Sequence, residues 1–175
     1  MAEGASHAEQ LLECARRNNT DLFAEIGAQL LDNEEAFGQL INSTKEIVSG
    51  NGPLHIATLF GNWDVLDLML DVPGVEIDPQ NRENQTPLHV AVKYSAEEPE
   101  LGYFIVDNLL DAGSDPRVLD SNGLRPVSYV VNNAKLLELL NNAEYAGAEA
   151  AGVSAAVGND DEDDGEDEGS ASDSE

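Results

Sequence analysis

Basic residues are scarce in this sequence, and the shortage sets its electrostatic character. Its 175 residues include eight Lys and Arg against 35 Asp and Glu, for a formal net charge of -27. Ten of the acids lie in residues 160–175, which hold no Lys or Arg, yet residues 1–159 still carry a net charge of -17. Such a field repels nucleic acid and anionic lipid and attracts basic partners. We therefore expect no direct binding to nucleic acid or to membranes.

Cysteine is nearly absent, and long apolar runs are missing. The single cysteine, Cys14, excludes an intrachain disulfide, which is typical of a reducing compartment. Its place beside Leu11 and Leu12 predicts a small core residue, not a reactive thiol. No segment is long and apolar enough to span a membrane, and residues 1–10 lack the pattern of a signal peptide. The sequence predicts a soluble protein of the cytoplasm and, at 18.7 kDa, also of the nucleus.

Catalytic and cofactor motifs are absent as well. The chain has no Cys-x-x-Cys pair, no Gly-x-x-x-x-Gly-Lys-Ser/Thr phosphate loop and no Gly-x-Ser-x-Gly nucleophile motif. The acidic run of residues 160–168 lacks the ligand spacing of a calcium-binding EF-hand. Of the three histidines, His55 and His89 lie 34 residues apart, and two ligands are a weak signal for a metal site. We expect no enzymatic activity, no metal and no cofactor.

The sequence does contain an internal repeat. Residues 52–57, Gly-Pro-Leu-His-Ile-Ala, match residues 86–91, Thr-Pro-Leu-His-Val-Ala, and residues 125–130 are a weaker copy. A second apolar run with helical spacing follows each copy. Residues 6–41 fit a degenerate first unit of two helices joined near residues 18–20, followed by a short helix near residues 34–40. The pattern therefore predicts that each unit consists of a helix, a turn, a second helix and a loop.

These residues resemble the ankyrin repeat, whose period is about 33 residues. In the strongest copy Thr86 suits a helix cap and Pro87 the first helical position, while Gly113 suits the positive φ that ends the second helix. The resemblance implies an all-α ankyrin-repeat solenoid of about four helix-turn-helix repeats, with degenerate repeats at both ends. It also implies that His55 and His89 hydrogen-bond the backbone of neighbouring loops.

The repeats set the expected domain boundaries. Residues 6–142 form the repeat domain, and residues 143–158 form either a linker or a helical extension. Residues 159–175 form a disordered acidic tail, because they contain too few apolar residues to fold alone. The expected repeats are residues 6–46, 47–80, 81–119 and 120–142, of which the last has a short second helix.

In ankyrin stacks the loop tips and the ends of the first helices form a concave surface, and the resemblance implies a binding site there. Phe60, Trp63 and Tyr94 are expected to form an aromatic patch rimmed by acids, which is typical of a protein-binding hot spot. Phe60 and Tyr94 can also simply pack beneath the loops. Residues 95–102 break the repeat register and are expected to form an acidic loop on the binding face. The predicted protein-binding residues are Phe60, Trp63, Glu83, Lys93, Tyr94, Glu97, Glu98, Glu100, Asp120 and Asn132.

An acidic groove with apolar anchors suits a basic amphipathic helix. The architecture and charge resemble the fungal ankyrin-repeat chaperones dedicated to a KH-domain ribosomal protein of the small subunit. This resemblance implies a basic ribosomal protein as the client. The protein is expected to be a monomer or a heterodimer with its client, and RNA is expected to displace it from the client. A generic ankyrin adaptor, a histone chaperone or nucleic-acid mimic, and a regulatory subunit of an enzyme are the other hypotheses. The acidic tail either covers the client or only confers solubility, and its residues are Asp160, Asp161, Glu162, Asp163, Asp164, Glu166, Asp167 and Glu168.

Overall fold

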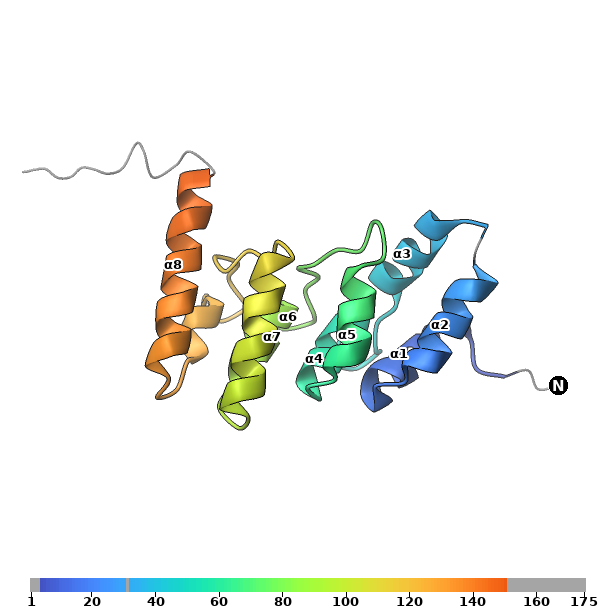
Figure 1. Ribbon diagram of the computed structural model, residues 1–175, viewed down its shortest axis with the longest axis horizontal. Coiled ribbons are helices and arrows are strands. Elements are labelled where there is room, and N and C mark those ends of the chain that lie inside the picture. The colour runs from blue at the N-terminus through green and yellow to red at the C-terminus, as the bar shows by residue number, and fades with distance from the viewer. Residues whose placement is uncertain (1–3, 31, 151–175) are drawn as a thin grey trace, which may run out of the picture.

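The computed structural model describes residues 4–30 and 32–150. Over these residues the fold is helical, which confirms the predicted all-α solenoid (Figure 1). The predicted acidic tail, residues 159–175, lies outside the described residues. The elements are α1 (His7–Arg17), α2 (Thr20–Gln29), α3 (Glu34–Ser43), α4 (Pro53–Leu59), α5 (Trp63–Leu70), α6 (Pro87–Tyr94), α7 (Pro99–Asp111), the 3-10 helix η1 (Pro126–Tyr129) and α8 (Ala134–Ala150).

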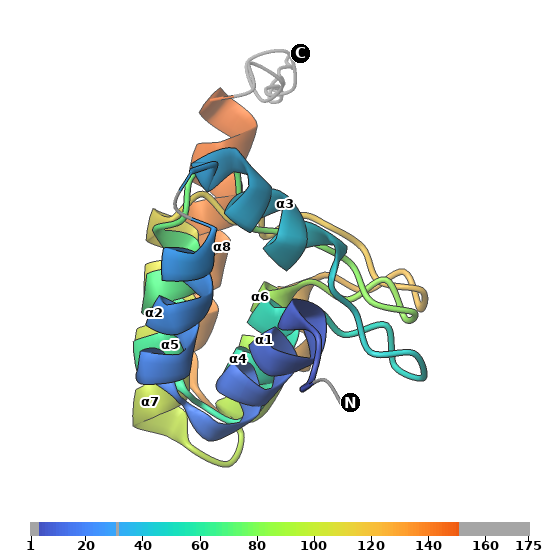
Figure 2. The same ribbon diagram turned by 90° about the vertical axis from the view of Figure 1, so that its right-hand side faces the viewer.

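The helices stand in two rows. Helices α1, α4, α6 and η1 contact one another in succession and form an inner row, while α2, α5, α7 and α8 form an outer row (Figures 1 and 2). Three long loops, which we call fingers 1, 2 and 3, extend away from both rows on the right of Figure 2. They comprise residues 44–52, 76–86 and 114–125. Helix α3 lies before finger 1 and packs against α1.

The core fills the space between the two rows. It consists mainly of Leu, Ile, Val and Ala side chains, including the fully buried Leu54, Leu66, Leu88 and Leu109. Cys14 is also fully buried, and burial raises the pKa of its thiol to about 11. The prediction of a core cysteine is therefore confirmed.

Helix ends follow the expected turn chemistry. Pro53 and Pro87 occupy the starts of α4 and α6, where a missing N–H costs no hydrogen bond. The Thr86 hydroxyl accepts from the backbone N–H of His89 and caps α6, as predicted. Gly61 has a φ of +67°, and a side chain there would overlap the Tyr94 hydroxyl. Glycine thus permits both the turn between α4 and α5 and the close approach of Tyr94 from the next repeat.

Two histidines connect successive repeats. In His55, Nδ1 accepts from the backbone N–H of Gly52 at 3.1 Å, and Nε2 donates to the carbonyl of Gln85 at 2.7 Å. His89 repeats the arrangement one repeat later, with Nε2 at 3.0 Å from the carbonyl of Leu124. Both rings are buried, so each polar atom needs its partner. The expected histidine-to-backbone bonds are confirmed.

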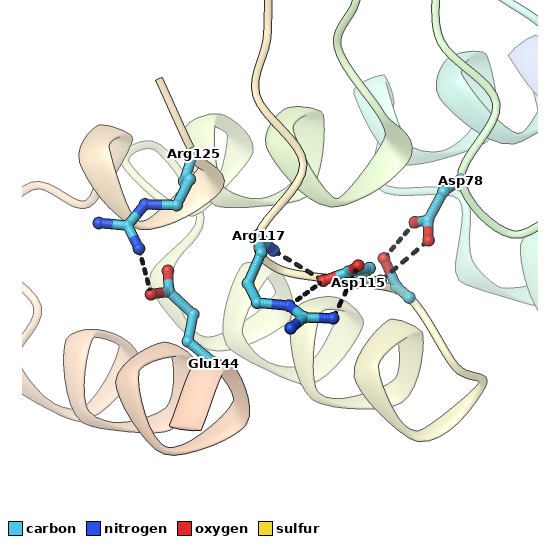
Figure 3. Close-up of polar contacts among 6 residues, drawn as sticks. Asp78, Asp115, Arg117, Arg125 and Glu144 are labelled. Carbon is cyan, nitrogen blue, oxygen red and sulfur yellow. Dashed lines mark hydrogen bonds and ion pairs between the residues drawn. The ribbon is translucent and has the colours of Figure 1, made fainter. Parts of the chain in front are cut away.

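The fourth repeat differs from the prediction at both helices. Its first helix is reduced to the single 3-10 turn η1, and its second helix is not short but runs through Ala150. Residues 143–150 are rich in Ala and Glu, which favour helix. Arg125 also donates to Glu144 of α8 at 2.7 Å (Figure 3). Residues 143–150 thus extend the helix, while residues 151–158 lie outside the described part of the chain.

A second polar network connects fingers 2 and 3 beneath the outer row. Asp78 accepts from the Ser114 hydroxyl at 2.5 Å and from the backbone N–H of Asp115 at 2.9 Å. Asp115 in turn accepts from Arg117 through Nε at 3.0 Å (Figure 3). Burial raises the pKa of Asp78, although the bonds from Ser114 and Asp115 oppose that rise. The network joins the segment that follows α5 to the segment that follows α7.

Acidification from pH 6.5 to pH 4 is expected to destabilise this fold. Burial lowers the pKa of His55 to about 4 and also lowers that of His89, so both rings bind a proton less readily in the folded protein than in the unfolded chain. The unfolded chain protonates them near the ordinary pKa of about 6.5. The free energy of unfolding is therefore highest above pH 6.5 and decreases as the pH is lowered toward 4. His55 accounts for a decrease on the order of 3 kcal/mol. Urea unfolding across the pH range measures the effect.

The variant His55→Gln should show a shallower pH dependence, because one of the two neutral rings is gone. His89→Gln should also flatten the pH dependence, because burial lowers the pKa of that ring as well. An equal slope in His55→Gln and the parent chain would contradict the assignment.

Candidate protein-binding surface

The three fingers are joined into one row by hydrogen bonds. Arg82 at the tip of finger 2 donates to the carbonyl of Ile47 through both Nε at 3.0 Å and Nη2 at 2.7 Å. Its backbone N–H also donates to the carbonyl of Ser49 at 3.1 Å. Between fingers 2 and 3, the N–H of Ser121 donates to the carbonyl of Glu83 at 2.8 Å. These bonds make the finger tips a continuous edge.

A groove of about 550 Å³ lies between this edge and the inner helices α4 and α6. Its apolar lining comes from Val48, Leu59, Val90 and Tyr94. Val48 is 87% exposed and Leu59 is 48% exposed, so both side chains are available to a partner. The polar lining consists of Ser49, Asn51, His55, Asn81, Arg82, Glu83, Gln85, Lys93 and Glu97.

The groove carries charges of both signs. Arg82 and Lys93 face Glu83 and Glu97 around the same lining. Lys93 Nζ lies 3.3 Å from Gln85 Oε1 and 4.9 Å from the centre of the Tyr129 ring. The predicted acidic groove is therefore wrong in its charge, because two bases line it beside two acids. The surface suits a segment that carries both apolar and mixed-charge side chains.

Four of the predicted residues line this groove together, namely Glu83, Lys93, Tyr94 and Glu97. Phe60 ends α4 and is 52% exposed beside Leu59. Tyr94 is half-buried against Gly61, which agrees with the view that this ring packs beneath its surroundings. Burial raises the pKa of its hydroxyl, and the neighbouring acids Glu98 and Glu97 raise it further.

Trp63 does not complete the predicted aromatic patch. It begins α5 in the outer row, where its ring packs edge-to-face against Phe104 of α7, with 5.0 Å between ring centres. The sequence places Trp63 three residues after Phe60, but the turn at Gly61 sends the chain from the inner row to the outer row. The two aromatic residues therefore belong to different rows.

The predicted acidic loop of residues 95–102 is only partly a loop. Helix α7 begins at Pro99, so residues 99–102 form its first turn. Gly102 lies against Ser95, where any side chain would overlap. Glu97 and Glu98 are exposed in the short turn, and Glu100 lies on a separate depression between α7 and α8. The insertion lengthens α7 rather than adding a loop over the groove.

Asp120 is a buried structural residue, not part of an exposed rim as predicted. Its carboxylate accepts from the Tyr129 hydroxyl, from the N–H groups of Asn122 at 2.9 Å and Leu124 at 3.0 Å, and from Gln85 at 3.4 Å. Burial by itself would raise the pKa of Asp120, but these hydrogen bonds outweigh burial and lower the pKa to about 2. Asp120 therefore holds finger 3 in shape.

Asn132 was predicted to contact a partner, whereas Ile47 and Val48 were not. Asn132 is exposed with a φ of +49° in the turn before α8, and it is not among the residues that line the groove. Ile47, at the tip of finger 1, is 86% exposed next to Val48, and the sequence analysis missed both. The available signal was an Ile-Val pair in an otherwise polar loop. The predicted tail residues 160–168 lie outside the described part of the chain.

Residues 4–30 and 32–150 contain no group of three or more His, Cys, Asp or Glu placed to hold a metal ion. Within the same residues, no helix has the length and apolar character needed to cross a membrane. The groove, with its exposed apolar side chains and mixed-charge lining, is the candidate site.

Comparison with known proteins identifies the repeat. Residues 49–78 match the family model described as ankyrin repeat. Over 148 residues the chain is 49% identical to ankyrin repeat-containing protein YGL242C of Saccharomyces cerevisiae. The aligned residues make up 82% of this chain and 81% of that relative. The chain belongs to the ankyrin-repeat proteins.

Other relatives share only part of their length with this ankyrin-repeat chain. Human B-cell lymphoma 3 protein is 33% identical over 84 residues, which are 46% of this chain and 17% of that protein. Palmitoyltransferase AKR1 of Lachancea kluyveri is 34% identical over 94 residues, 53% of this chain and 11% of that protein. Ankyrin repeats are protein-binding modules, so the predicted protein-binding role holds at that level.

Replacing Asp120 with Ala is expected to lower the free energy of unfolding by about 3 kcal/mol, because several buried donors lose a charged acceptor. Urea unfolding with a fitted slope measures the change. Glu83→Ala, on the exposed tip of finger 2, is the matched control and should cost less than about 0.5 kcal/mol. Unchanged stability in Asp120→Ala would refute the structural role.

Proposed function

We propose that this ankyrin-repeat protein is a non-catalytic escort for a basic protein, namely a small-subunit ribosomal protein before its assembly into pre-ribosomes. The observation that carries the proposal is the net charge of -27 on a chain whose repeats form a partner-sized groove. Free ribosomal proteins are strongly basic, and an acidic cover shields them from other polyanions. We place the escort in the cytoplasm and nucleus, as a monomer or as a heterodimer with its client.

The groove supplies the local contacts. The exposed apolar side chains of Val48 and Leu59 in its lining, together with Phe60 next to Leu59, accept the apolar face of an amphipathic helix. Glu83 and Glu97 pair with Lys or Arg of that helix, while Arg82 and Lys93 pair with its acids. The bound segment is therefore of mixed charge, and the long-range attraction comes from the acidic rest of the chain.

Release requires no nucleotide in this proposal. Most of the attraction is electrostatic, and it weakens as salt screens the charges. RNA is a denser polyanion than the acidic chain, so the client transfers to RNA when its rRNA site becomes available. Neither a cofactor nor a catalytic residue takes part in the cycle.

A generic ankyrin adaptor is the second candidate, and the mixed charge of the groove favours it. Arg82 and Lys93 in the lining make a purely basic segment a poor local match. An adaptor would bind partners without a common basic character, and salt would affect the affinity little. Capture of the chain's partners from extract, identified by mass spectrometry, separates the two. One stoichiometric basic ribosomal protein without the rest of the ribosome is expected, and signalling proteins or histones would contradict it.

Replacing Leu59 with Ser is expected to weaken binding of the captured partner about tenfold, because one apolar contact of the groove is lost. Leu137→Ser, an exposed leucine of α8 outside the groove, is the matched control and should leave the affinity unchanged. Titration calorimetry with purified partner gives both constants. Equal losses in the two variants would show that the groove is not the contact surface.

The triple variant Glu97→Gln, Glu98→Gln and Glu100→Gln is expected to weaken the same partner about fivefold and to flatten its salt dependence. Each exposed carboxylate contributes a small attraction to Lys or Arg. Affinity measured over a salt series checks both effects. An unchanged salt dependence would exclude the turn before α7 from the interface.

A further inference from the structure

Four helices that contribute no residue to the groove carry acids and no bases. The segments of α2, α3, α5 and α7 contain nine Asp and Glu and no Lys, Arg or His. Ion pairs of the described residues involve Glu13, Glu46, Asp115 and Glu144, none of which lies on these helices. The few bases of the chain are therefore kept off this surface.

Several of these acids lie where they destabilise the free protein. Asp64 and Asp67 of α5 and the C-cap residue Asp71 form one stripe at positions i, i+3 and i+7, with Leu68 inside it. Like charges at this spacing repel each other. Asp67 and Asp71 also lie at the C-terminal end of α5, where the helix dipole disfavours negative charge, and its last turn holds no base. A bound cation would relieve both effects.

An apolar pocket opens beside this stripe. It has a volume of about 300 Å³ and lies where α2, α3 and α5 meet. Leu68 on its wall is 39% exposed, although it is a large apolar side chain. Phe37 forms another wall, and its ring packs against the ring of Phe23 with 5.0 Å between ring centres. Because this contact holds the Phe37 ring in place, the pocket exists before a partner binds. Its lining is Gly27, Leu30, Glu34, Phe37, Leu68, Asp71, Val72 and Pro73.

We propose that this pocket and the α5 stripe form a second docking surface, which binds a Lys/Arg-rich amphipathic helix of the protein partner. One apolar side chain of that helix enters the pocket against Leu68 and Phe37. Its cationic side chains meet Glu34 and Asp71 at the rim and Asp67 on the stripe. This inference rests on the basic partner of the proposed function and assigns the purely basic contact to the outer helices.

The charge of the two surfaces decides which partner segment each one takes. The groove offers Arg82 and Lys93 as well as acids, so a uniformly basic helix meets repulsion there. The pocket rim offers only Glu34 and Asp71 as ionisable groups. A basic helix is thus complementary to the outer surface and not to the groove.

The probe is a fluorescein-labelled amphipathic peptide with Leu and Lys at helical spacing, titrated with the full chain by anisotropy at low salt. Asp67→Asn with Asp71→Asn is expected to weaken peptide binding about fivefold. The same double variant should raise the Tm of the free chain by about 2 °C, because repulsion and dipole conflict are removed. Leu68→Ser should weaken binding about tenfold, since the apolar wall is lost.

Glu83→Gln with Glu97→Gln, which removes the same number of charges from the groove, is the matched control and should change peptide affinity less than twofold. A loss in this control and none in the α5 variants overturns the second surface and leaves the basic partner of the proposed function intact. Failure of the parent chain to bind the peptide overturns both. A fall in Tm in the α5 double variant shows that the carboxylates are structural and overturns the inference.

Discussion

The fold depends on one constraint: each repeat can bury its apolar face and its histidine only against the next repeat. His55 reaches the backbone of finger 2, and His89 reaches the backbone of finger 3, each from a fully buried ring. The same bonds therefore hold the helices in register and set the spacing of the fingers. Because the groove lies between fingers and inner helices, its shape follows from this buried contact.

Charge is distributed unevenly over this scaffold. Helices α2, α3, α5 and α7 carry acids and no bases, whereas Arg82 and Lys93 lie in the groove and Arg82 also joins fingers 1 and 2. The protein therefore presents two chemically different surfaces, a groove of mixed charge and a set of acidic helices. A partner with a basic helix and a separate amphipathic segment would match both, which agrees with an escort that covers its client.

The sequence predicted the repeated parts of the fold well, and the irregular parts poorly. The Thr-Pro-Leu-His motif specifies a capped helix through local geometry, so α6 followed from the residues, whereas the resemblance to ankyrin repeats implied the backbone bonds of His89. The fourth repeat lacks this motif, and its reduction to a 3-10 turn and a long α8 depends on contacts such as Arg125 with Glu144. The position of α7 depends on the packing of Gly102 against Ser95, which no local pattern reveals.

The candidate site shows the same division. Glu83 at a loop tip, Lys93 and Tyr94 at the end of a first helix, and Glu97 in the inserted stretch were all predicted and do line the groove. An acid count could not distinguish the buried Asp120 from an exposed acid. Hydrogen exchange of the full chain, free and bound to its captured partner, tests the two-faced account most directly. The account predicts slower exchange both in fingers 1 and 2 around the groove and along α5. Protection confined to α8, with the fingers and α5 unchanged, would contradict it.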